Sequence, residues 1–217
     1  MSIQQPILSD SHARIGIVED PEGLSAIRRP GYPAVIWQRS PMARFQTWID
    51  GLDPQHLPST RTTLRPNAVP NALEHLCNAA GTPDCEERAC LVGDISALAY
   101  VFAEVMQADF LLMRLDIVTT NACRRFHIDA VTARLVCTYR GTGTQYGLAS
   151  NGEEPGDIST VPTGAPIVLR GTNWPVTPPC GFLHRSPPIE GSGETRLVLV
   201  LDPVDSADIE ETHHSMH

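Results

Sequence analysis

The feature that most constrains this 217-residue chain is a series of short, β-rich segments that begins near residue 110. The segments are rich in β-branched, aliphatic and aromatic residues and are separated by Gly, Pro, Asn or Ser, as strands are. They read FLLMRLDIVTT, RRFHID, TARLVCTYRG, APIVLRG, CGFLH and TRLVLVLD. Strands of this length and spacing suit a jelly roll or a small barrel. The second half of the chain is therefore predicted to be mainly β.

The first half is predicted to be mixed α and β. YPAVIWQR (33–40) predicts a strand, and SPMARFQTWIDGL predicts a helix with Ser40 as N-cap and Pro41 at its first position. Two further helices are predicted from VPNALEHLCNAAG and from ERACLVGDISALAYVFAEVMQAD, despite Gly93. We expect these elements to cover a sheet. The predicted fold class is α+β, mainly β, with a jelly-roll core and an N-terminal cover of helices and strands.

The chain length predicts one domain over residues 1–217. A hydrophobic content of 41% is enough for one substantial core but not comfortably for two. The metal-binding, β-rich core is expected over 110–202, with flexible tails at 1–13 and 204–217; the second tail ends in a histidine-rich run. The polar stretch TGTQYGLASNGEEPGDISTVPTG predicts a long surface loop.

Charge and hydropathy exclude several classes of partner. The formal net charge is −9, from 25 acidic and 16 basic residues, and the basic residues form no run, which argues against nucleic acid. The apolar stretches ALAYVF and RLVLVLD fall far short of the roughly 18 residues of a membrane span. The N-terminus does not resemble a secretory signal, so we expect a cytoplasmic protein. A homodimer is left open.

The cysteines give no sign of a metal site or a disulfide framework. Six cysteines, at positions 77, 85, 90, 123, 137 and 180, contain no CxxC pair. In a reducing compartment we expect them to be free thiols, mostly buried.

A histidine and an aspartate lie one residue apart within RRFHID. If this segment is a strand, His127 and Asp129 point to the same face. The next histidine, His184, lies at the end of another predicted strand. Two histidines and one carboxylate form the facial triad of non-haem Fe(II) oxygenases, and zinc accepts the same ligands. The alternative is a structural histidine that is simply hydrogen-bonded to Asp129.

Two further residues are candidates for cofactor binding. Arg196 begins the apolar strand that also contains Val198 and Val200, and a guanidinium turned inward there would need an anion beside it. Its planar fork matches a carboxylate. The alternative is an arginine at a solvent-exposed strand edge. Tyr139, on the strand after HID, could hydrogen-bond a co-substrate or could be a core residue.

The order HxD, His, Arg over residues 127–196 resembles the Fe(II)/2-oxoglutarate-dependent oxygenases. This resemblance implies a double-stranded β-helix core, Fe(II) with zinc as the alternative, and 2-oxoglutarate as co-substrate. It also implies that Arg196 binds the distal carboxylate of 2-oxoglutarate.

A closer resemblance involves CRRFHIDAVTARLVCTYRGTGTQY, GFLHRSPP and TRLVLVLD. These segments are similar to a bacterial family of unknown function, number 1826, over about Arg14 to Asp202. Members of that family are associated with zinc-responsive gene neighbourhoods, so this resemblance implies a metal more strongly than a reaction. Three hypotheses follow: an oxygenase acting on an unidentified small-molecule or protein substrate, a zinc-binding protein of metal homeostasis, and a zinc hydrolase, for which the sequence identifies no general base.

Overall fold

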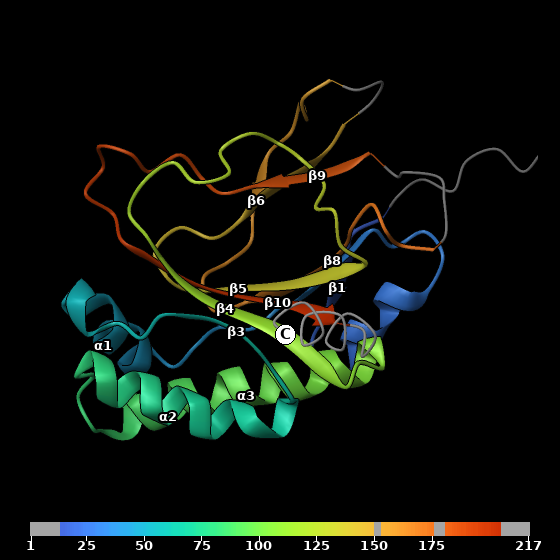
Figure 1. Ribbon diagram of the computed structural model, residues 1–217. Coiled ribbons are helices and arrows are strands. Elements are labelled where there is room, and N and C mark those ends of the chain that lie inside the picture. Colours follow the sequence, from blue (N-terminus) through green and yellow to red (C-terminus); the bar gives the residue numbers. More distant parts are fainter. Residues whose placement is uncertain (1–13, 150–152, 176–180, 205–217) are drawn as a thin grey trace, which may run out of the picture.

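The computed structural model describes residues 14–149, 153–175 and 181–204. The predicted N-terminal tail, and all of the predicted C-terminal tail except Val204, therefore lie outside the described residues. Figure 1 shows three layers, with helices on one face of a large sheet and a small sheet on its other face.

The middle layer is a seven-stranded sheet with the order β1-β2-β8-β5-β10-β4-β3. Its strands are β1 (Gly16–Val18), β2 (Ala34–Trp37), β3 (Thr60–Leu64), β4 (Phe110–Val118), β5 (Ala133–Arg140), β8 (Pro166–Arg170) and β10 (Arg196–Val204). All neighbours pair antiparallel except β1 and β2. The small sheet, of order β7-β6-β9, contains β6 (Gln145–Leu148), β7 (Ser159–Thr160) and β9 (Phe182–Arg185).

The strand connections are those of a jelly roll. From β4 onward the chain passes repeatedly between the two sheets, and β4, the first strand of this core, pairs with β10, the last. The β4–β5 connection also reaches the small sheet, where His127 forms an isolated antiparallel bridge with His184 of β9. The predicted double-stranded β-helix core with an N-terminal cover is therefore confirmed.

Residue alternation along β10 divides the core in two. Leu197, Leu199 and Leu201 pack with the helices, whereas Val198 and Val200 pack with residues between the two sheets. Side chains that alternate with the three leucines therefore face the interior of the jelly roll.

The helical layer contains α1 (Ala43–Gly51), α2 (Val69–Ala80) and α3 (Glu86–Met106). Three short 3-10 helices, η1 (Glu22–Arg28), η2 (Pro54–His56) and η3 (Pro66–Ala68), complete the cover. The predicted Ser40 cap is wrong, because α1 begins at Ala43, two residues after the predicted first position, and its N-cap residue Met42 makes no side-chain cap. Helix α2 ends at Gly81, which adopts a left-handed φ of 67°.

Helix α3 is long and apolar enough to cross a membrane by length and composition alone. Its residues Leu91, Ile95, Leu98 and Phe102 are buried in the core cluster that also contains Leu199 of the large sheet. The core helix of a soluble protein meets the same criterion as a membrane span, so length and composition alone do not distinguish the two.

Two local predictions were wrong. RRFHID is not a strand, because only His127 makes a backbone bridge, and the segment is otherwise irregular. The segment predicted as one long polar loop contains β6 and β7. Both strands are short and lie in a polar stretch, so hydrophobic periodicity does not reveal them. Position 147 of β6 has no room for a side chain, because a Cβ on Gly147 would lie 2.4 Å from Pro155 Cβ.

The cysteines within the described residues are free, as predicted. They are not mostly buried, however. Cys77 and Cys137 are buried, Cys85 is partly buried, and Cys90 and Cys123 are exposed.

Candidate metal centre

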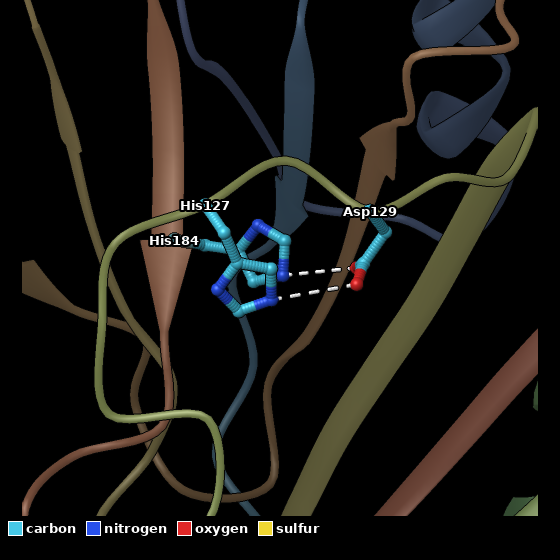
Figure 2. Close-up of side chains that lie close together, drawn as sticks. All are labelled: His127, Asp129 and His184. Carbon is cyan, nitrogen blue, oxygen red and sulfur yellow. Dashed lines mark ion pairs between the residues drawn. The ribbon is translucent and has the colours of Figure 1, made fainter.

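Three side chains meet where the β4–β5 connection contacts the small sheet. His127 and Asp129 come from that connection and His184 comes from β9, and both imidazoles point toward the carboxylate (Figure 2). The backbone holds the two histidines together: each main-chain N–H donates to the other residue's carbonyl, at 3.0 and 3.1 Å. This bridge, rather than strand alternation, brings the predicted group together.

The distances fit a single metal ion. Asp129 Oδ1 lies 3.4 Å from His127 Nε2, and Asp129 Oδ2 lies 3.0 Å from His184 Nε2. One ligand atom from each residue lies within 4.8 Å of the other two. Donor atoms bound about 2.1 Å from one ion lie roughly 3.0–3.5 Å apart, so both aspartate–histidine distances already suit a common ion, and the widest pair of the group would move closer when an ion binds.

One carboxylate oxygen lacks a proper partner in the protein. Asp129 Oδ2 is buried and receives no well-directed hydrogen bond from the described residues, although His184 Nε2 is close. The other oxygen, Oδ1, lies 2.6 Å from Arg134. A buried, unsatisfied oxygen is costly without a ligand, so the centre fits a cation at Oδ2.

The hydrogen bonds also prepare His127 to bind a metal. Its Nδ1 lies 2.8 Å from the carbonyl of Arg125, which can only accept, so Nδ1 carries the proton and Nε2 keeps its lone pair. The contact with Asp129 raises the pKa of His127. Burial alone would raise the pKa of Asp129, but both histidines and the charge of Arg134 outweigh it and hold that pKa well below its usual range.

Arg134 connects the centre to the large sheet, and sequence reasoning missed it. Its guanidinium donates to both oxygens of Asp202 on β10, at 2.6 and 2.7 Å, while NH1 reaches Asp129. Asp202 is 5% exposed. The signal in the sequence was an arginine in an apolar strand, on the same face as Val136 and Thr138. The same argument singled out Arg196.

Arg196 is buried on the interior face of the jelly roll, with 1% exposure. Its guanidinium donates to the Thr142 carbonyl at 2.6 Å and makes longer contacts, at 3.4 Å, with Ser186 Oγ and Thr138 Oγ1. No carboxylate of the described residues pairs with it directly. Burial lowers the pKa of Arg196 to about 10, and the charge of Glu194 opposes this effect only in part.

Tyr139 is not part of this centre. It alternates with Thr138 on β5 and therefore faces the helices, where its hydroxyl donates to Asp94 at 2.6 Å. There it lines a separate cavity of about 480 Å³ together with Arg39 and Phe45. The prediction that Tyr139 binds a co-substrate is corrected by this position on the opposite face of the sheet.

The fold and the site together define the class: a jelly-roll protein with a two-histidine, one-carboxylate group that can hold a metal ion. The chain belongs to the family described as "Protein of unknown function (DUF1826)", whose model matches residues 18–202. No curated protein is detectably similar in sequence.

Solved structures of dioxygenases are similar in fold. Dioxygenase for auxin oxidation 1 from Arabidopsis thaliana, in complex with 2-oxoglutarate, has a TM-score of 0.53 at 11% identity, with 90% of this chain and 94% of that chain covered. The dioxygenase for auxin oxidation in rice has a TM-score of 0.51 at 12% identity, with 90% and 84% covered. At such identities the likeness extends to the fold alone.

Proposed function

We propose that this protein is a non-haem Fe(II)- and 2-oxoglutarate-dependent oxygenase. The observation that carries the proposal is Arg196, a buried guanidinium on the same interior face as the His127–Asp129–His184 group. Within the described residues only neutral groups hydrogen-bond to it. Burying such a charge without an anion is unfavourable, and a bidentate carboxylate would compensate for the cost.

The separation of the two sites suits a short diacid. Ser186 follows His184 by two residues, just beyond the end of β9, and its hydroxyl lies 3.4 Å from the Arg196 guanidinium. Arg196 therefore lies next to the end of the strand that carries one histidine ligand. A five-carbon diacid is long enough to bridge the two.

Each residue then has a defined role. His127, Asp129 and His184 would hold the iron on one face and leave positions open on the other. Arg134 orients Asp129 by binding Oδ1, which leaves Oδ2 for the metal. Arg196 would bind the distal carboxylate of 2-oxoglutarate. When bound, iron and 2-oxoglutarate supply the oxidation of a substrate C–H bond by O₂, with succinate and CO₂ as co-products.

A zinc-handling protein would explain the three ligands but gives no reason for a buried arginine beside them. The oxygenases of similar fold favour the iron reading. Zinc therefore remains the alternative metal rather than the preferred one.

The experiment begins with metal binding. Calorimetric titration with Fe(II) under anaerobic conditions should give one tight site per chain in the wild type. His127→Ala and Asp129→Ala should lose at least about two orders of magnitude of affinity, as expected when a ligand is removed. The backbone bridge between the histidines does not depend on their side chains, so His127→Ala should stay folded. His75→Ala, on the exposed surface of α2, is the matched control.

The second stage measures conversion of 2-oxoglutarate to succinate by the iron form, with and without the same substitutions. Slow conversion without added substrate is expected in the wild type and in His75→Ala only. Unchanged metal affinity in both ligand variants, or equal succinate formation in all proteins, would contradict the proposal.

A further inference from the structure

We propose that Arg61 and Arg114 form a binding site for the acid group of the substrate, which would be a small organic acid carrying a carboxylate, phosphate or phosphonate. Arg61 of β3 lies directly opposite Arg114 of β4 in the antiparallel register. Because Leu111, Met113 and Leu115 of β4 pack with the helices, both arginines face the other side of the sheet, where the metal centre lies.

The repulsion between these arginines is compensated only in part within the protein, by carboxylates 3.9 Å from Arg114. Like charges directly opposite each other on antiparallel strands destabilise a sheet. Arg61 is exposed and has no hydrogen bond or ion pair with the described residues. An anion between the two guanidinium groups would turn this repulsion into attraction.

Arg114 retains donors that its neighbours do not use. Its side chain is 21% exposed, and its Nε is buried without a partner among the described residues. Its terminal nitrogens lie 3.9 Å from Asp116 Oδ2 and 3.9 Å from Asp202 Oδ2, which is longer than a hydrogen bond. Asp202 already accepts two hydrogen bonds from Arg134. Arg114 can therefore donate to a ligand without giving up a hydrogen bond.

The pair lies next to the candidate metal centre. Arg114 and Arg134 approach the same carboxylate, that of Asp202, and Arg134 also contacts Asp129. Strands β4 and β5 both flank β10, so they are two strand spacings apart, about 10 Å. An acid group held at Arg114 would place a more distant carbon of the same molecule at the metal.

The ligand chemistry follows from the two guanidinium groups. Each presents a planar set of N–H donors that matches the oxygens of a carboxylate or phosphate. The nearby acidic side chains do not satisfy both arginines. Asp129 belongs to the metal group and Asp202 is held by Arg134. The remaining carboxylate, Asp116, is 43% exposed and lies 3.9 Å from Arg114, too far for a hydrogen bond. The site should therefore reject neutral molecules of the same shape.

Calling this ligand a substrate rests on the proposed function, but binding of the anion does not require turnover. The test uses the full chain loaded with Zn(II) and follows the Nε–H signals of Arg61 and Arg114 by NMR. The probes are phenylacetate, phenylphosphonate and inorganic phosphate, with phenylacetamide as the neutral match of phenylacetate. At least one anion should shift both signals saturably, and phenylacetamide should not.

Substitutions test the assignment. Arg114→Gln should weaken binding of the best anion about tenfold or more, as for loss of one charge-assisted contact, and Arg61→Gln severalfold. Arg65→Gln is the control, since Arg65 follows β3 but stacks on Phe110. Three results would overturn the inference: no shift with any anion, equal shifts with phenylacetamide, or wild-type affinity in Arg114→Gln. Anion binding without any response to 2-oxoglutarate would instead contradict the oxygenase proposal alone.

Discussion

At the scale of single residues, the carboxylate of Asp129 is divided between two kinds of partner. Arg134 binds Oδ1, and Oδ2 is buried beside His184 without a well-directed donor. One oxygen is thus fixed by the protein while the other is left for a cation. This division explains how a residue in an irregular connection can be oriented as well as one in a strand.

Arg196 allows function and stability to be separated. We predict that Arg196→Met leaves the free energy of unfolding within about 1 kcal/mol of the wild type, because loss of a buried charge offsets the unpaired Thr142 carbonyl. Affinity for 2-oxoglutarate should fall by one to two orders of magnitude. Urea denaturation and calorimetric titration of the iron form measure the two effects.

Arg140→Met is the matched control, since Arg140 on β5 donates to the Leu52 carbonyl and does not contact the centre. It should keep wild-type affinity for 2-oxoglutarate. A loss of affinity in both variants would indicate a general disturbance of β5 and β10 rather than a contact to the co-substrate.

Residue types and order in the sequence predicted the three members of the metal group, whereas the direction of Arg196 was left open between the interior and a solvent-exposed strand edge. The partners of Asp129 could not be predicted, because Arg134 and Asp202 meet only through the pairing of β5 with β10. The choice between the two roles considered for Tyr139 could not be made from the sequence, because one position of strand register decides which face a side chain occupies. The sequence does not reveal that register before the strand ends are known.

At the scale of secondary-structure elements, the connection that carries His127 and Asp129 depends on close backbone packing. A Cβ on Gly171 would lie 1.9 Å from the Val131 carbonyl oxygen and 2.6 Å from that of Asp129. We predict that Gly171→Ala displaces this connection and weakens Fe(II) binding about tenfold or more. Calorimetric titration of the metal measures this effect.

Gly93→Ala is the contrasting substitution. Gly93 lies inside α3, where an added Cβ would meet nothing within 4 Å. Alanine there should raise the free energy of unfolding by about 0.5–1 kcal/mol and leave metal affinity unchanged. A similar loss of metal affinity in both variants would show that the effect of Gly171→Ala is not local.

The ion pair between Arg134 of β5 and Asp202 of β10 is predicted to contribute a large coupling energy to stability. Arg134→Leu leaves the buried Asp202 carboxylate with only the distant Arg114, and should cost about 3–5 kcal/mol of unfolding free energy. Asp202→Leu should also destabilise the protein, and the double variant should recover part of the loss. Urea denaturation of all three variants gives the coupling energy, and simple additivity would contradict a direct pair.

The elements themselves were only partly predictable. Strands β4, β5, β8 and β10 follow from apolar, β-branched runs, and α2 and α3 from helical periodicity. Strands β6 and β7 were hidden in a polar stretch, because they are short and their pairing in the small sheet is set by distant β9. RRFHID lacks the apolar alternation that a strand needs, and His127 is held by one backbone bridge instead.

At the scale of the whole molecule, the helices and the metal group occupy opposite faces of one sheet. Alternation along β10 directs leucines to the helices, whereas Arg196, the valines and Asp202 face the jelly-roll interior. The helical layer can therefore stabilise the sheet without contributing to the centre. The single-domain organisation over 1–217 stays a prediction, as do the expected partners and cellular location.

The central claim is that this interior binds Fe(II) and 2-oxoglutarate together. The most direct measurement is the visible metal-to-ligand charge-transfer band of the anaerobic Fe(II) protein during titration with 2-oxoglutarate. We predict a saturable band in the wild type and no band in Asp129→Ala, which lacks the carboxylate ligand. Absence of the band in the wild type, together with tight binding of zinc at the same residues, would contradict the claim.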